Sequence, residues 1–120
     1  MIKNPTPVDP SANVSFGTRR GKVQVRFATT FIDRLVGLLS SSGLPIDSGL
    51  YFPKCSAVHT FGMRFAIDVL FLDAECRVLK IVTMSRWKVS IHSKADSVLE
   101  LQAGACGYHD IKIGQKLWKV

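Results

Sequence analysis

Residues 66–73 read AIDVLFLD, and this short stretch decides the fold that the rest of the chain must complete. Its apolar side chains fall on both sides of an extended segment, with Ile67, Val69 and Phe71 opposing Leu70 and Leu72. A strand that is apolar on both faces is typical of the middle of a sheet that is covered on each side. We therefore predict a central strand here and expect the other strands to be arranged around it.

Further strands are predicted wherever apolar and polar residues alternate between turn residues. Three segments have this pattern: KVQVRFA at 22–28, RVLKIV at 77–82 and VLELQ at 98–102. Two more short strands are predicted at GLYF, residues 49–52, which Pro53 ends, and at KLWKV, residues 116–120. The turn Asp73–Glu75 joins the central strand to the segment at 77–82, which predicts a hairpin.

One segment has the pattern of a helix. Thr30 is a suitable N-cap, Asp33 places a carboxylate in the first turn, and Phe31, Leu35, Leu38 and Leu39 share one helical face. The predicted fold is mainly β, a small sandwich or partly closed barrel of six to eight short strands with one helix near residues 30–40. Residues 1–21 are expected to form an N-terminal arm and turn, and residues 22–120 a single β-rich domain.

The composition indicates a folded chain of one domain. Its 120 residues, 47% of them hydrophobic, are enough to bury a core.

No apolar run approaches the roughly 20 residues that cross a bilayer, and the N-terminus lacks the apolar stretch of a secretory signal. Cys55, Cys76 and Cys106 form no CxxC pair, which argues against a disulfide framework and against a thiolate zinc site. We therefore expect a cytoplasmic protein without a transmembrane segment.

The charge is strongly positive, with a formal net charge of +7. Four of the cations are clustered near the N-terminus, at Arg19, Arg20, Lys22 and Arg26. Such a field is suited to nucleic acid, to anionic lipid or to an acidic protein as a partner. The preferred interpretation is a solvated surface that keeps the protein soluble. No basic helix or RNA-binding motif accompanies the charge, so nucleic-acid binding is expected to be weak and non-specific at most.

The stretch CSAVHTFGMRFAID at 55–68 brings a thiol, an imidazole and a carboxylate close together in the sequence. On an extended strand, Cys55 and His59 lie about 13 Å apart at ~3.3 Å per residue, which is too far for two ligands of one zinc ion. We therefore expect no metal site and no cofactor. Cys55 is a weaker candidate for a reactive thiol, as is Cys106 with His109 in the glycine-rich segment GACGYHD.

Asp68 is the most informative polar residue, because a carboxylate beside an apolar strand needs hydrogen bonds or a cation. It is interpreted first as a structural brace. The functional alternative is a small polar pocket, formed by His59, Thr60, Arg64, Asp68 and Glu100.

Three segments resemble successive blocks of the family known as domain of unknown function 192, which occurs in bacteria and archaea. They are FATTFIDRLVGLL at 27–39, CSAVHTFGMRFAIDVLFLDAECRVLKI at 55–81 and VLELQAGACGYHDIKIGQKL at 98–117. The matching positions are Arg34, Gly37 and Leu38, then Asp68, Phe71 and Asp73, then Leu99, Glu100, Ala103 and Gly104, and finally Gly114. HTFGM at 59–63 departs from the commoner Trp-Met-Lys-Asn-Thr. The resemblance implies a mainly β, sandwich-like fold and no established activity.

The leading functional hypothesis is a non-enzymatic binding or assembly module. One alternative is a small enzyme of hydrolase type that uses Asp68, Glu100 and His59, and the residues alone leave open whether the chain is an enzyme. The other alternative is a weak, basic nucleic-acid binder. A contiguous exposed apolar surface would favour the module, and a pocket that joins the three titratable groups would favour the enzyme.

Overall fold

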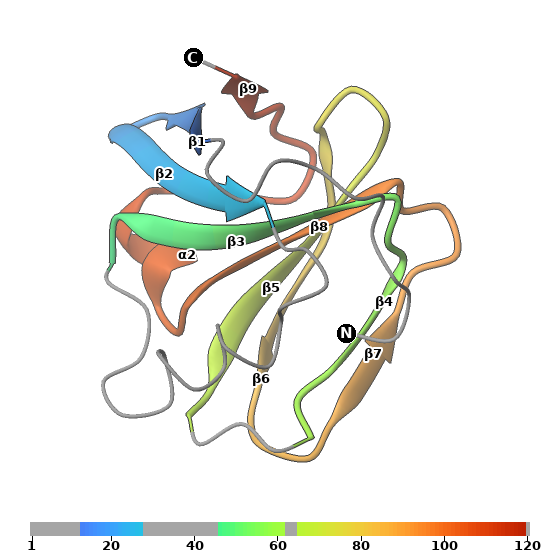
Figure 1. Ribbon diagram of the computed structural model, residues 1–120. Helices are drawn as coiled ribbons and strands as arrows, with labels where there is room; N and C mark the ends of the chain where they lie inside the picture. The colour runs from blue at the N-terminus through green and yellow to red at the C-terminus, as the bar shows by residue number, and fades with distance from the viewer. Residues whose placement is uncertain (1–12, 28–45, 62–64, 120) are drawn as a thin grey trace.

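The computed structural model describes residues 13–27, 46–61 and 65–119 (Figure 1). These residues form nine strands, of which the last has only two residues, and one short helix. The elements are β1 (Asn13–Thr18), β2 (Gly21–Phe27), β3 (Ser48–Pro53), β4 (Ala57–His59), β5 (Ile67–Leu72), β6 (Val78–Met84), β7 (Val89–Ile91), β8 (Ser97–Gln102), α2 (Ala105–Tyr108) and β9 (Trp118–Lys119). The predicted mainly β fold is confirmed, and the helix predicted near residues 30–40 lies outside the described residues.

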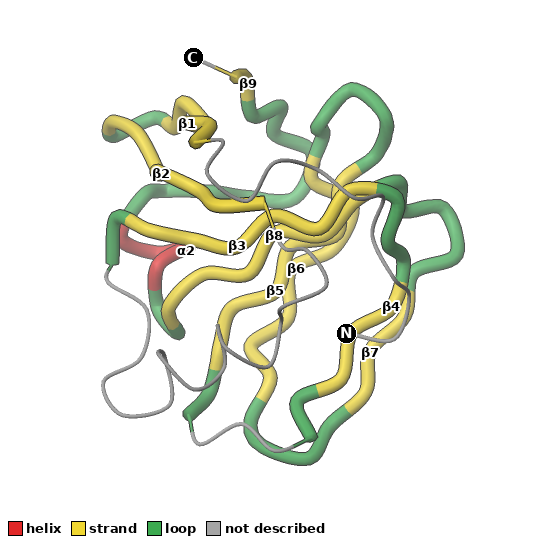
Figure 2. The backbone as a smooth tube through the Cα atoms, viewed as in Figure 1, coloured by secondary structure: helices red, strands yellow, loops and turns green. Residues whose placement is uncertain are grey.

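Seven strands form one sheet in the order β6-β5-β8-β3-β2-β1-β9, as Figure 2 shows (yellow tube). The strand β5 pairs with β6 on one side and with β8 on the other, and all of its residues are buried. The predicted central strand and the hairpin that follows it are therefore confirmed. One pair, β2 with β3, is parallel, whereas the other pairs in this sheet are antiparallel.

The last residues of the chain connect the two edges of the sheet. A single antiparallel bridge joins Arg77 to Lys116 near the start of β6, and β9 then pairs with β1. The sheet is not closed into a barrel, because only this one bridge joins the last segment to the β6 edge among the described residues. Residues 13–18, expected as part of an N-terminal arm, form β1, since their pairing with β2 gives them a full ladder of hydrogen bonds.

Each face of the main sheet has its own core, because directly paired residues on neighbouring strands share a face. The first core contains Tyr51, Leu70, Leu99 and Leu101, and further residues of β1, β2, α2 and the C-terminal segment close over it. The second core lies on the opposite face and contains Leu50, Phe52, Val58, Val69, Phe71 and Val98. The two-stranded sheet β4–β7 lies beside the main sheet (Figure 1). It contributes Val58 to the second core.

Two further elements appear where none was predicted. The strand β7 pairs with β4, and α2 forms within a segment of glycine-rich turns. Both elements are very short, so their stability comes from tertiary packing rather than from local propensity. In the part of the chain that the structure describes, no helix has the length and apolar character needed to cross a membrane.

Gly49→Ala is expected to lower the free energy of unfolding by about 2 kcal/mol, because the added methyl group would overpack the sheet. A Cβ atom at Gly49 would lie 2.6 Å from Leu101 Cδ2 and 2.9 Å from the backbone oxygen of Glu100, so a backbone atom must move. Gly107→Ala is the matched control, since a Cβ atom there meets nothing within 4 Å among the described residues. Urea melts of both variants measure the effect, and equal midpoints would contradict it.

Candidate functional site

Asp68 lies on β5, on the face of the first core, and three donors hold its carboxylate. Oδ1 accepts a hydrogen bond of 2.7 Å from the hydroxyl of Thr83 on β6. Oδ2 accepts bonds of 3.1 Å each from the backbone N–H groups of Gly104 and Cys106, where α2 begins. The carboxylate therefore joins β5, β6 and the start of α2, and the donors that a buried carboxylate requires are backbone groups and a hydroxyl.

Glu100 lies on β8 between Leu50 of β3 and Val69 of β5, so its side chain is on the face of the second core. It is 1% exposed, and its Oε2 atom has no hydrogen-bond partner among the residues that the structure describes. Burial raises the pKa of Glu100 to about 8, which favours the protonated carboxyl group at neutral pH. A buried carboxyl group in this state is an unusual feature of an otherwise apolar layer.

The two carboxyl groups do not meet. Asp68 pairs with Leu101, the residue after Glu100, and side chains of neighbouring residues on a strand point to opposite faces. The hypothesis of one pocket that joins Asp68, Glu100 and His59 is therefore wrong, because the sheet separates the carboxyl groups of Asp68 and Glu100. Arg64, its remaining charged member, lies outside the described residues.

Cys106 and His109 do not form a nucleophile and base. Burial raises the pKa of the Cys106 thiol to about 12, with a further contribution from Asp68, so the reactive thiolate is not populated at neutral pH. The buried His109 uses Nε2 to donate a hydrogen bond of 2.9 Å to the carbonyl oxygen of Ile46. This nitrogen therefore serves the fold and does not act as a base for the thiol. Both side chains pack where α2 meets the rest of the fold.

Cys55 is buried, and its thiol donates a hydrogen bond of 3.2 Å to the carbonyl oxygen of Ala57. This contact satisfies the thiol within the turn that precedes β4. Within the ranges 13–27, 46–61 and 65–119, no group of three or more His, Cys, Asp or Glu side chains is placed to hold a metal ion.

Thr60, which follows β4 directly, is fully buried and holds the turn between β6 and β7. Its Oγ1 atom donates a hydrogen bond of 2.7 Å to the carbonyl oxygen of Ser85 and accepts one of 2.8 Å from the N–H group of Lys88. Its backbone N–H donates to the carbonyl oxygen of Lys88 at 2.9 Å, and its own carbonyl oxygen accepts from the N–H group of Trp87 at 3.4 Å. Thr60 therefore positions Trp87.

Trp87 has a backbone conformation that a bulky residue rarely adopts. Its φ angle is 63°, in the left-handed region, and its side chain is 64% exposed. A non-glycine residue in this region costs on the order of 1–3 kcal/mol, and such strain is concentrated at functional positions. The position is therefore a candidate for a role outside the fold.

Trp87 belongs to a row of aromatic rings. The ring of His59 lies 5.0 Å from that of Phe61, and the ring of Phe61 lies 5.7 Å from that of Trp87, as measured between centroids. Val89 pairs with His59 across the small sheet and Ile91 pairs with Ala57, so both share the outer face with the rings. Phe61, Val89 and Ile91 are each at least half exposed. We call His59, Phe61, Trp87, Val89 and Ile91 the aromatic face.

The aromatic face contains residues that no sequence motif identified, apart from His59. The sequence pattern that could have drawn attention to these residues is the alternation of Trp87, Val89 and Ile91 with more polar residues. This alternation is the pattern of a half-buried strand. In the structure, the inner position Ser90 accepts a hydrogen bond of 3.1 Å from Lys80 of β6. The apolar side of β7 is the side that faces outward, and the alternation alone does not reveal this.

The model of the family DUF192, described as uncharacterised, matches residues 13–118. Among curated proteins, a UPF0127 protein of Pyrococcus horikoshii is 31% identical over 91 residues, which cover 70% of this chain and 71% of that protein. A UPF0127 protein of Pyrococcus abyssi is 32% identical over 101 residues, which cover 81% of this chain and 85% of that protein.

Two solved structures share the fold. One is described as a putative transcription regulator from Sinorhizobium meliloti, with a TM-score of 0.73 and 19% identity, covering 95% of this chain and 98% of that one. The other is a protein of unknown function from Novosphingobium aromaticivorans, with a TM-score of 0.67 and 19% identity, covering 98% of this chain and 94% of that one. At this identity the likeness concerns the fold alone.

Proposed function

Because this chain belongs to the DUF192 family, whose members have no established activity, we propose a function from its own surface: it is a non-enzymatic binding module that docks a partner protein on the aromatic face. The observation that carries this proposal is Trp87, which is exposed and held in the left-handed region by the contacts of Thr60 with its turn. Strain that does not serve burial of the side chain is expected to serve an interaction.

The composition of the aromatic face supports a protein partner. Tryptophan and other aromatic residues are enriched among the residues that dominate binding energy at protein interfaces. The tilted ring pair of Phe61 and Trp87 gives a rigid apolar centre, and Val89 and Ile91 extend it along β7. Such a contiguous apolar surface is typical of interaction sites.

The charge around the aromatic face indicates the chemistry of the partner. Arg86 and Lys88 flank Trp87 in the same turn, and both are exposed. A partner segment that places carboxylates beside apolar side chains would complement this arrangement. We therefore propose an acidic, apolar segment of another protein as the occupant.

The enzyme alternative receives little support from the positions of its residues. Asp68 and Glu100 point to opposite faces of the sheet, and Asp68 already accepts three hydrogen bonds within the fold. A general acid and base must both reach the same reacting group. The cytoplasmic location also stays a proposal, supported by the odd number of cysteines and by the lack of a CxxC pair in the sequence.

The test is a selection of peptides from a random library on the parent protein. Peptides that bind are expected to combine apolar residues with Asp or Glu, and to lose at least about tenfold in affinity on Trp87→Asn, as for a central interface residue. Because Asn tolerates the left-handed region, Trp87→Asn should unfold at no lower temperature than the parent. Loss of binding without loss of stability separates a docking role from a structural one.

Two further variants sharpen this test. Thr60→Val removes the hydroxyl that holds the turn of Trp87, so it should weaken peptide binding although Thr60 is buried and cannot touch the peptide. Trp118→Leu changes an exposed tryptophan elsewhere on the surface and is the matched control. Selected peptides that are basic, or that bind Trp87→Asn as tightly as the parent, would overturn the proposal.

A further inference from the structure

A second surface, apart from the aromatic face, is strongly positive. The turn between β1 and β2 carries Arg19 and Arg20, and the segment that follows α2 lies against it. We define the hairpin end by its exposed residues, which are Arg19, Arg20, Lys22, Lys112, Lys116 and Trp118.

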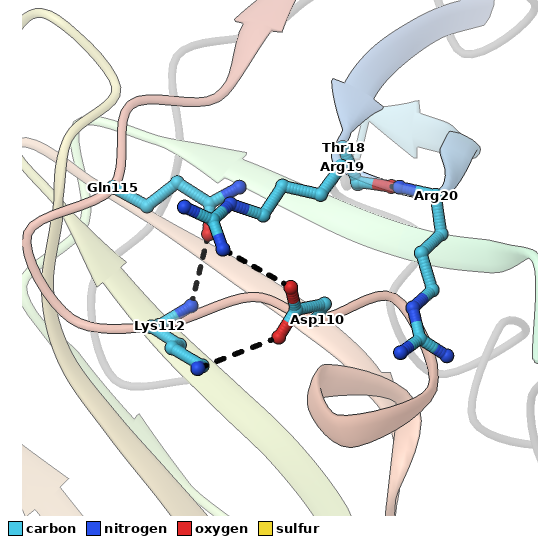
Figure 3. Close-up of polar contacts among 6 residues, drawn as sticks. All are labelled: Thr18, Arg19, Arg20, Asp110, Lys112 and Gln115. Carbon is cyan, nitrogen blue, oxygen red and sulfur yellow. Dashed lines mark hydrogen bonds and ion pairs between the residues drawn. The ribbon is translucent and has the colours of Figure 1, made fainter.

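Three of these cations surround one carboxylate, as Figure 3 shows. Arg19 Nη1 lies 3.2 Å from Asp110 Oδ2, and Lys112 Nζ lies 3.7 Å from Asp110 Oδ1. The hydrogen bond from Arg19 lowers the pKa of Asp110, and the charges of Lys112 and Arg20 lower it further. One carboxylate among three cations leaves excess positive charge at this place, and Lys22 and Lys116 add to it.

Trp118 forms a flat apolar surface on the same face of the sheet as one of these cations, Lys22. Its indole fills the space above Gly17, where a Cβ atom would collide with Cε2 and Nε1 of the ring. Gly17 pairs with Trp118 on one side and with Lys22 on the other, so the three residues share the outer face of the sheet. The indole therefore lies on the backbone of β1 and is still 51% exposed. Lys22, on β2 at the other side of β1, is the cation on the same face.

We propose that the hairpin end binds single-stranded nucleic acid without sequence preference, with phosphates at the cations and a base stacked on Trp118. Positive residues that follow the backbone, combined with an aromatic side chain that receives a base, are the common elements of such sites. This site is independent of the docking function proposed for the aromatic face. The small number of cations makes the binding weak and strongly dependent on salt.

The test is the fluorescence anisotropy of labelled oligothymidylate, titrated with the full chain at several salt concentrations. Binding is expected in the micromolar range at low salt and should disappear near physiological salt. The double variant Arg20→Ser, Lys22→Ser should make the slope of log affinity against log salt shallower by about 1.4, that is, about 0.7 for each phosphate that a cation no longer neutralises. Arg86→Ser with Lys88→Ser removes the same charge from the aromatic face and should leave this slope unchanged.

Stacking is tested separately from charge. Trp118→Leu keeps an apolar contact with Gly17 but cannot stack on a base, so affinity should fall about 5- to 100-fold, whereas Trp118→Phe should retain most of it. Asp110→Asn removes the carboxylate among the cations and should tighten binding.

Two results would overturn the assignment. One is an equal loss of affinity in the two double variants, which would mean that binding follows net charge alone. The other is tighter binding of polyglutamate, or of vesicles rich in phosphatidylserine, than of oligothymidylate at the same salt concentration, which would assign the hairpin end to an acidic protein or to a membrane.

Discussion

Glu100→Gln is expected to make the protein markedly more stable above neutral pH and to remove most of the decline in stability that the parent shows as pH rises. The cause is the buried carboxyl group, whose pKa is raised by burial from 4.5 to about 8. Both folded and unfolded chains hold the proton below pH 4.5, so the group imposes no penalty there. Between pH 4.5 and 8 the unfolded chain loses its proton while the folded chain keeps it, and stability falls.

The magnitude follows from the width of this interval. Each unit of difference in pKa corresponds to about 1.4 kcal/mol, so ionisation of Glu100 removes on the order of 4 kcal/mol by pH 8. Glutamine has nearly the same shape and no ionised form, so the curves of parent and variant should cross. At pH 5 the variant is equal or slightly worse, because its amide brings an extra N–H group into an apolar layer.

Urea melts from pH 5 to pH 9 measure this difference. Glu75→Gln is the control, because it removes a carboxylate from an exposed turn and should leave the pH dependence of the parent unchanged. Parallel stability curves for the parent and Glu100→Gln would contradict the prediction, since they would mean that Glu100 ionises equally easily in the folded and unfolded chains.

Asp68→Ala is expected to lower the free energy of unfolding by about 3–5 kcal/mol, because it leaves three donors without their acceptor. Two of these donors, the N–H groups of Gly104 and Cys106, belong to the backbone and cannot turn away. Their loss of a partner should loosen the start of α2, which Asp68 holds against β5.

Asp68→Asn separates the charge from the shape. The amide oxygen can still accept from the two N–H groups, and the hydroxyl of Thr83 can rotate to accept from the amide nitrogen. What disappears is the extra strength of bonds to an ionised acceptor, so the expected decrease in the free energy of unfolding is about 1.5–3 kcal/mol. Asp96→Asn, at an exposed aspartate, is the matched control. A melt of Asp68→Asn that overlays the parent would contradict the role of Asp68 as a structural brace.

The sequence identified Asp68 as a polar residue that matters for the fold, but it did not identify the residues that form hydrogen bonds with it. Asp68 stands beside an apolar strand, and this position alone predicts that it needs donors. The partners come from Thr83 and from the turn at Gly104, which are distant in the chain. Such partners depend on the register of two strand pairs, and no local pattern encodes that register.

The aromatic face was not predictable for a related reason. Trp87, Val89 and Ile91 alternate like the residues of any strand with one buried side, and the natural expectation is that such a side faces the core. In the structure the core on this side is already filled by Val58 and its neighbours, so the apolar side of β7 faces outward. Alternation shows which residues share a face, whereas the packing of other elements decides whether that face is covered.

The sequence by itself determined the class of fold, the central strand β5, its hairpin with β6, and membership of a family, because these depend on local alternation and on motifs read in order. Tertiary structure alone decided that the sheet separates Asp68 from Glu100 and that Trp87 is exposed under backbone strain. It also decided that Glu100 is buried with no partner for Oε2 in the described part of the chain. The physical reason is that side chains on a strand change face with every residue. A single step in register therefore decides which groups meet, and only the paired strands define that step.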